Sequence, residues 1–187
     1  MFRIATEAER PGVLLFRKDA FEQEHAYAPL DRFDAEAVHL VAIEPARAMV
    51  STARLLLPEQ RPFDLEETID FRHFLSPTAV PAMVGGFSVH PDFRSINKSI
   101  LIQLGMLKLT FVIAQRYDVT DIVIYTFLHL LNFYKMAWFK AVCSSFFHKG
   151  YQRDMIVMNL NLHDFLTLGL QRRGRMSEIL SQVHLEL

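Results

Sequence analysis

The chain has 187 residues, 51% of them hydrophobic, and a formal net charge of −1. This length favours a single domain over residues 1–187 with a substantial core, and the balanced charge argues against nucleic acid as a partner. The single cysteine, Cys143, excludes an internal disulfide framework and is expected to pack against its apolar neighbours. The eight histidines show no metal-ligand spacing, so we expect no metal. The N-terminus has charges where a signal peptide needs an apolar run, and no run reaches ~18 uncharged apolar residues, so we expect a cytoplasmic protein without a transmembrane segment.

The first predicted element is a helix over about Glu7–His25, because Thr6 followed by Glu9 has the spacing of a capping box. Asp31 and Asp34 follow in a loop, where aspartate also favours turns.

Two predicted strands come next, at Val38–Ile43 and Met49–Leu57, joined by a hairpin at 44–47. Arg54 lies inside the second strand, where it either faces water or meets the carboxylates of Asp31 and Asp34. The proline-rich segment 58–81, with a short helix near Leu65–Phe71, is a candidate wall or lid of a substrate site.

The central unit runs from Met83 to Arg116. Residues Met83–His90 are strand-like, and the paired glycines Gly85 and Gly86 indicate a bulge or a close backbone approach. A proline ends this strand, and a long, mostly apolar helix follows from Asn97.

The start of this helix offers free backbone N–H groups, the positive end of the helix dipole and the charges of Arg94 and Lys98. These features suit a phosphate or pyrophosphate. The alternative is an ordinary strand–helix corner with solvated basic residues.

The C-terminal third is predicted as a strand at Asp121–Phe127, a helix at about Leu128–Lys140, and two closing strands at Val142–Phe147 and Arg153–Leu160. Short helices are expected at His163–Leu168 and Ser177–Leu185. The basic turn 172–175 between them is either a solvated loop or a contact for an acidic carrier protein.

Four groups of residues carry a family resemblance. They are Arg17-x-x-x-Phe21 with Tyr27 and Asp31-x-x-Asp34; Arg54-Leu-Leu-Leu-Pro58 with Arg61-Pro62-Phe63; Val89-His90-Pro91-Asp92-Phe93-Arg94; and Tyr134-x-x-x-Trp138. Their order and spacing resemble the GCN5-related N-acetyltransferase (GNAT) superfamily over roughly residues 3 to 160. Within it they resemble the LuxI-type acyl-homoserine-lactone synthases and the long-chain N-acyl amino acid synthases.

The resemblance implies an α+β fold, with a mixed central sheet, a bulged and splayed middle strand and flanking helices. It also implies transfer of an acyl group from a thioester, acyl-carrier-protein or acyl-CoA, to the amine of an amino acid or related small molecule. The implied donor-binding residues are Val89, Arg94, Asn97, Lys98 and Ser99.

For the chemistry, the resemblance implies backbone N–H groups near Gly86 and Phe87 for the oxyanion and Tyr134 as the acid that protonates the leaving thiol. Tyr134 could equally be a helix tyrosine packed beside Trp138. His90 is a weak candidate base, direct or through water, although a histidine at a strand end is often structural.

The implied substrate contacts lie on both sides of the reacting carbonyl. The residues expected to hold the acceptor are Arg17, Phe21, Asp31, Asp34 and Arg54. Phe87, Phe111 and Phe127 are expected to line an acyl tunnel, although most of the sixteen phenylalanines must be core.

The sequence also departs from the family pattern. Asn97 replaces a glycine that lets the backbone approach a pyrophosphate. This replacement suits carrier-bound phosphopantetheine better than coenzyme A, and the alternative is weak donor binding altogether. Met83 and Gly86 stand where both neighbouring groups usually have Glu and Arg. Three hypotheses therefore stay open: an N-acyltransferase, a lactone synthase that uses S-adenosylmethionine, and a catalytically silent acyl-binding module.

Overall fold

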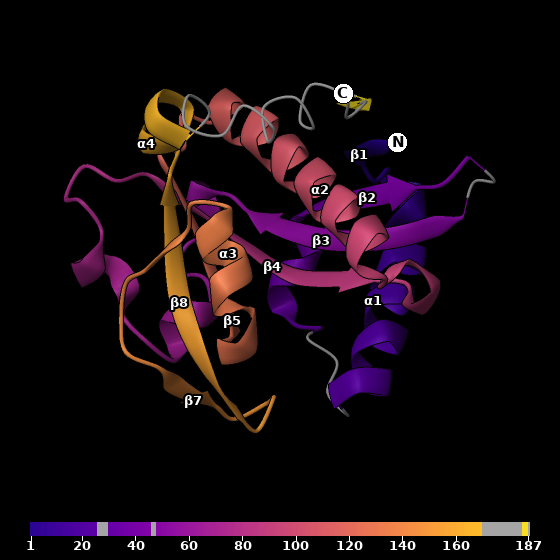
Figure 1. Ribbon diagram of the computed structural model, residues 1–187, viewed down its shortest axis with the longest axis horizontal. Helices are drawn as coiled ribbons and strands as arrows, with labels where there is room; N and C mark the ends of the chain where they lie inside the picture. Colours follow the sequence, from indigo (N-terminus) through magenta and orange to yellow (C-terminus); the bar gives the residue numbers. More distant parts are fainter. Residues whose placement is uncertain (26–29, 46–47, 170–184, 187) are drawn as a thin grey trace.

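The computed structural model describes residues 1–25, 30–45, 48–169 and 185–186. Its centre is a mixed sheet whose strands lie in the order β6-β8-β5-β4-β3-β2-β1-β9, with β7 paired to β8 (Figure 1). The β4–β5 pair is parallel, and β2, β3 and β4 form an antiparallel meander. This mixed sheet confirms the fold class expected from the sequence.

The strands and helices have the following bounds. The strands are β1 (Phe2–Ile4), β2 (Val38–Ile43), β3 (Met49–Leu56), β4 (Pro81–Val89), β5 (Asp121–Phe127), β6 (Lys140–Ala141), β7 (Phe146–His148), β8 (Arg153–Asn161) and β9 (Leu185–Glu186). The helices are α1 (Arg10–His25), α2 (Ile96–Arg116), α3 (Leu131–Met136) and α4 (Leu162–Asp164), which continues into a π turn at Phe165–Gly169.

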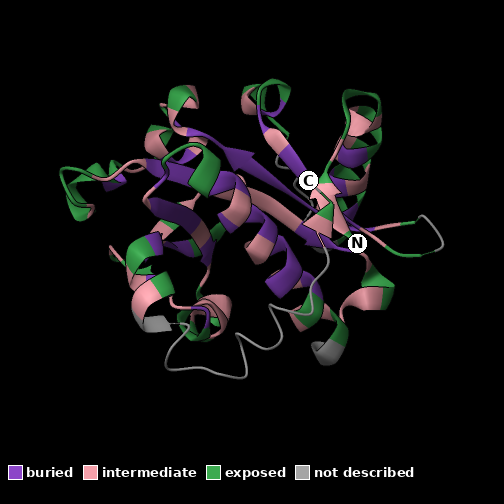
Figure 2. Cartoon of the chain, turned by 90° about the horizontal axis from the view of Figure 1, so that it is seen from above, coloured by how far each residue is buried: buried purple, intermediate pink, exposed green. Residues whose placement is uncertain are grey.

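The sheet separates two apolar layers. On one face, α2 packs against β1, β2 and β3, with Leu104, Leu109 and Ile113 in the larger core cluster. On the other face, Phe63, Leu65 and Phe71 form a second cluster with strand residues. Figure 2 shows that buried residues concentrate in the strands and on the inward sides of the helices.

Helix α2 needs this position because few of its residues are polar. By length and hydropathy, Lys98–Arg116 would suit a membrane span, and it is the one such helix in the described ranges. In the structure it is the core helix that covers the sheet, where apolar surface is removed from water.

The predicted capping box at Thr6 and Glu9 is present, and it begins a short 3-10 turn at Glu7–Glu9. This turn leads directly into α1, which begins at Arg10. The Glu9 carboxylate accepts hydrogen bonds from the backbone N–H and the hydroxyl of Thr6 at 2.9 Å. The proline-rich segment forms three 3-10 helices, Pro58–Gln60, Asp64–Glu67 and Phe71–Phe74, in place of the one short helix expected.

The structure corrects several expectations in the C-terminal third. The helix expected to reach Lys140 ends at Met136, and Trp138 then has a left-handed φ of 72°. The strand expected at Val142–Phe147 is replaced by the short strands β6 and β7. Leu185 lies in β9, parallel to β1, and not in a helix. Most of the predicted 177–185 helix and the basic turn 172–175 fall outside the described residues.

Candidate functional site

The strands β4 and β5 separate in the middle of the sheet. They pair only at Pro81–Asp121, Ala82–Ile122 and Met83–Val123. Beyond this point β4 continues on β3 alone, whereas β5 continues on β8. Residues 84–87 of β4 are consequently only partly buried although they lie mid-sheet. The predicted splay is therefore present, and it leaves a slot between the two strands.

A bulge in β4 lies beside this slot. Thr52 pairs with Ser88, and Arg54 pairs with Gly85, so β4 has one extra residue between these pairs. Gly86 has a φ of +58°, as expected for a glycine in such a bulge. A Cβ at Gly86 would lie 2.7 Å from Cδ of Arg17, so the missing side chain makes room for that arginine.

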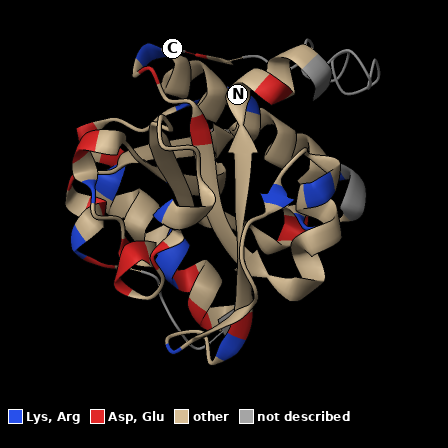
Figure 3. Ribbon diagram, turned by 90° about the vertical axis from the view of Figure 1, so that its left-hand side faces the viewer, with Lys and Arg blue, Asp and Glu red and all other residues tan. Residues whose placement is uncertain are grey.

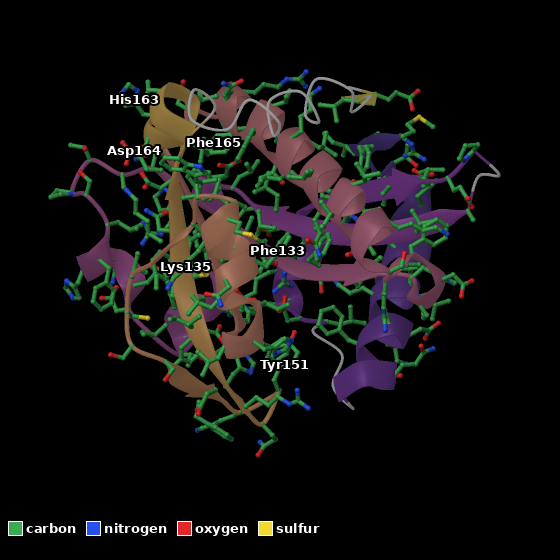
Figure 4. The ribbon with its side chains drawn as sticks, in the orientation of Figure 1. Phe133, Lys135, Tyr151, His163, Asp164 and Phe165 are labelled. Atoms are coloured by element: carbon green, nitrogen blue, oxygen red, sulfur yellow. The ribbon has the colours of Figure 1, made fainter. Side chains whose placement is uncertain are left out.

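A cavity of about 400 Å³ occupies the slot. Its walls come from β4, β5, α2 and α3, and from Ala20 and Phe21 at the C-terminal half of α1. Phe133 on α3 and Tyr151 in the turn before β8 also line it (Figure 4). The size and the mostly apolar lining suit a small organic ligand or an acyl chain.

Of the three phenylalanines expected in an acyl tunnel, Phe87 and Phe127 line the cavity. Phe111 is not among the lining residues, because its ring packs against Phe165 with centroids 4.7 Å apart in the core.

Tyr134 lines the same cavity. Burial raises the pKa of its phenol to about 12, and a hydrogen bond with the side chain of Thr126 opposes this shift. The phenol is thus protonated at neutral pH and can donate a hydrogen bond to a ligand. Its ring packs edge-on against Phe133 and Phe139.

Two polar atoms in the cavity wall have no hydrogen-bond partner among the described residues. They are Oγ of Ser88 and Oε1 of Gln103, and both are buried. A buried polar atom without a partner is costly, so these atoms indicate a ligand that carries hydrogen-bonding groups. No sequence pattern marks Gln103 as a functional residue, because it is one polar residue in an otherwise apolar helix.

The predicted donor turn lies at the mouth of the cavity. Val89, Arg94 and Ser99 line the cavity, and Arg94 Nε donates to the carbonyl oxygen of Val89 at 2.8 Å. The ammonium of Lys98 lies 4.9 Å from the ring centre of Phe93. The backbone of Asn97 lies in the first turn of α2, and its side chain is not described. The helix start and Arg94 therefore meet at the place where an anion is expected.

His90 does not line the cavity. Its Nδ1 accepts a hydrogen bond from the backbone N–H of Asp92 at 3.3 Å and caps the 3-10 turn at Pro91–Phe93. The structure thus gives His90 a local structural role.

The four charged residues among the predicted acceptor contacts form one ion-pair network on the α1 face, whereas Phe21 lines the first cavity. Arg17 pairs with Asp34, and Arg54 donates to Asp31 at 2.7 and 2.8 Å and to Asp34 at 3.2 Å. Both arginine side chains are at most 1% exposed. The carboxylates hold the pKa of Arg54 above its usual value against the cost of burial. Figure 3 shows that acidic and basic positions are interspersed along the ribbon on the side facing the viewer.

Asp64 also belongs to this network, and sequence analysis missed it. Its Oδ2 accepts from Arg54 Nη2 at 2.5 Å and from the Tyr125 hydroxyl at 3.2 Å. Asp64, Asp31 and Tyr125 line a second cavity, of about 530 Å³. Tyr125 lines both cavities, so the two meet at this side chain. Among the described residues, no group of His, Cys, Asp or Glu side chains has a metal-binding arrangement.

Residues 15–103 match the family of acetyltransferase (GNAT) domains, over the helix, the hairpin, the bulged strand and the donor turn described above. Over this stretch, a little under half of the chain, the sequence is similar to a GNAT domain. No curated protein matches the sequence.

Solved structures extend the GNAT fold over the remaining strands. FeeM, an N-acyl amino acid synthase from uncultured soil microbes, covers 92% of this chain and 96% of its own, with a TM-score of 0.77 and 14% identity. The match to BjaI, a CoA-dependent acyl-homoserine lactone synthase solved with SAM and isopentyl-CoA, covers 100% of this chain and 93% of BjaI, with a TM-score of 0.70 and 14% identity. LasI, an AHL synthase, covers 90% and 94%, with a TM-score of 0.65 and 13% identity. These likenesses establish the fold of the whole chain.

Proposed function

We propose that this GNAT-fold chain is a cytoplasmic acyltransferase that moves an acyl group from a pantetheine thioester to the amine of an amino acid or related small molecule. The observation that carries the proposal is the cavity in the β4–β5 slot, lined by Tyr134 and by the bulged backbone at Gly86 and Phe87. The structural neighbours include an N-acyl amino acid synthase and lactone synthases, which supports the same reaction class.

The donor is proposed to enter with its phosphate at the start of α2. Arg94 and Ser99 line that end of the cavity, while Leu107 and Thr110 line it two to three turns deeper along the helix. A pantetheine arm carries amide groups between its phosphate and its sulfur, and these would meet Gln103. Because Asn97 stands in place of the family's glycine, we favour a carrier-protein thioester over acyl-CoA.

The reaction forms a C–N bond and breaks a C–S bond, and one proton passes from the amine to the leaving thiolate. Backbone N–H groups at the bulge would stabilise the oxyanion. A phenol with a pKa of about 12 is a weaker acid than a thiol, whose pKa is about 8.5. Tyr134 is therefore proposed to donate a hydrogen bond that stabilises the sulfur as negative charge develops.

Replacing Tyr134 with phenylalanine is expected to lower kcat by about 10²-fold, with little change in the KM for the donor. The ring and its packing against Phe133 and Phe139 would remain, so stability should change little. Steady-state kinetics of thiol release measure this effect. Thr126→Val removes the hydrogen-bond partner of the Tyr134 phenol but leaves the Tyr134 hydroxyl in place, so kcat should fall much less.

Replacing Gln103 with leucine is expected to raise the KM for a carrier-protein thioester by about 3- to 10-fold, the value of one hydrogen bond. The effect should vanish with a simple alkyl thioester of the same fatty acid, which has no amide to pair with Gln103. If KM rose equally with both thioester donors, Gln103 would not contact the pantetheine arm.

The function itself is tested by release of thiol from acyl-carrier-protein thioesters of several chain lengths. Each thioester is assayed with the proteinogenic amino acids and separately with S-adenosylmethionine. We expect release with at least one amino acid. Release with S-adenosylmethionine alone would instead identify a lactone synthase. Tight binding of the acyl thioester without release would identify an acyl-binding module.

A further inference from the structure

The β4 strand of this chain supplies no carboxylate to accept a proton from the attacking amine. Met83, which stands where the resembling synthases have Glu, is fully buried in an apolar cluster. Its neighbours there include Phe63 and Leu65, which flank Asp64 in sequence. The 3-10 helix that packs on Met83 therefore brings a carboxylate close to the place where the family has one.

Asp64 bridges the two edges of the slot. Tyr125 and Gly85 each lie two residues beyond the last β4–β5 pair, Met83–Val123, and so on the same face of the sheet. Tyr125 donates to Asp64 from the β5 edge of the slot, and Arg54 donates to it from β3, where it pairs with Gly85 on the β4 edge. The Asp64 carboxylate thus lies over the slot on the α1 face, 15% exposed to the second cavity.

Fully buried N–H groups without partners face the same stretch of β4. Nε of Arg54 lies 3.5 Å from the position that a Cβ of Gly85 would take. A Cβ of Gly86 would lie 3.2 Å from Nε and 2.7 Å from Nη1 of Arg17. None of these three nitrogen atoms has a hydrogen-bond partner among the described residues. They are donors suited to a carboxylate, and they indicate that a ligand carrying an acceptor group belongs here.

The local charge favours a cation beside that carboxylate. The network joins two arginines, Arg17 and Arg54, to three aspartates, Asp31, Asp34 and Asp64, which leaves one negative charge in excess. Asp31 and Asp64 are the members that line the second cavity. An amino acid, with a carboxylate and an ammonium group a few ångströms apart, matches this arrangement.

We propose that Asp64 binds the ammonium group of the acceptor and takes one proton from it, which leaves the neutral amine that attacks the thioester carbon. The N–C bond then forms and the C–S bond breaks. The second proton that the nitrogen loses passes to the leaving thiolate, while the first passes from Asp64 to water, which restores the carboxylate. This role rests on the proposed acyl transfer. Burial and the nearby charge of Asp31 raise the pKa of Asp64, which improves it as a proton acceptor near neutral pH.

The test measures kcat/KM for the amino acid that the wild type uses. It compares the wild type with Asp64→Asn at about pH 7 and at about pH 9.5. Asparagine keeps the shape and can still accept from Tyr125. We expect a loss of about 10²-fold at the lower pH and a much smaller loss at the higher pH, where more of the free amine is already neutral. A structural role for Asp64 would give the same loss at both.

Other groups that face Asp64 should not imitate this pH dependence. The pKa of Tyr125 is raised by burial and that of His148 is lowered by burial, so both stay neutral between these two pH values. The charged groups that also face the second cavity or the carboxylate are Arg54, Asp31, Arg32 and Glu67. Glu67→Gln is the matched control, because Glu67 lines the same cavity but pairs with the exposed Arg32 at 2.7 Å.

Three outcomes separate the two proposals. Full activity of Asp64→Asn, or an equal loss at both pH values, would overturn the role of Asp64 and leave acyl transfer standing. No transfer by the wild type with any amine would overturn the proposed function itself. Asp64→Glu is assayed in parallel to separate a folding defect from a catalytic one. If the carboxylate accepts a proton, Asp64→Glu must recover at least part of the activity that Asp64→Asn loses.

Discussion

Replacing Arg54 with methionine is expected to lower the free energy of unfolding by about 3–5 kcal/mol, because it leaves buried carboxylates without their counter-charge. Arg54 is 1% exposed and is bound to Asp31, Asp34 and Asp64 at 2.5 to 3.2 Å. Methionine keeps much of the apolar contact of the arginine stem, so the loss reports the charge. Urea unfolding, followed by circular dichroism, measures this difference.

The matched control is Arg32→Met. Arg32 also pairs with a carboxylate, Glu67, at 2.7 Å, but the two side chains are 70% and 56% exposed. An exposed pair of this kind contributes about 1 kcal/mol or less. Equal losses in the two variants would contradict the view that the Arg54 network is a buried, mutually dependent unit.

The second large effect is expected for Gly86→Ala, which should destabilise the protein by about 2–5 kcal/mol and lower acyl transfer at least tenfold. A residue with a Cβ pays about 1–2 kcal/mol for the left-handed backbone, and overpacking typically adds about 1–3 kcal/mol. Here φ is +58° and the new Cβ would lie 2.7 Å from Arg17. Moving Arg17 or the bulge would also displace the proposed oxyanion donors.

Gly12→Ala provides the control for this substitution. Gly12 lies in α1, and a Cβ added there would meet nothing within 4 Å. Alanine is the better helix former, so this variant should be up to about 1 kcal/mol more stable and fully active. If Gly86→Ala behaved in the same way, the bulge would not be the rigid feature that the proposed chemistry needs.

The elements that the sequence predicted well are those with strong local patterns. The hairpin strands β2 and β3, the strand β5 and the helix α2 lie within one residue of the expected bounds, because continuous apolar runs and breakers define them. The helix after β5 was predicted too long, since its apolar pattern continues through Trp138. The left-handed backbone at that residue has no local signal, because tryptophan is not a residue that favours this conformation.

Contacts within the candidate site were predicted only where a motif suggested them, and were missed where distant segments meet. A contact of Arg54 with Asp31 and Asp34 was one of the two alternatives that the sequence left open, and the structure contains it. Asp64 could not be found in this way, because its partner Tyr125 lies 61 residues away and reaches it only through the sheet order.

The most direct test of acyl transfer is to follow both halves of the product at once. The enzyme is incubated with a carrier-protein thioester whose acyl chain is labelled with ¹³C and with amino acids labelled with ¹⁵N, and the products are analysed by mass spectrometry. The account predicts an amide that contains both labels in one molecule. Labelled acyl groups that stay on the carrier, or appear only as free fatty acid, would contradict it.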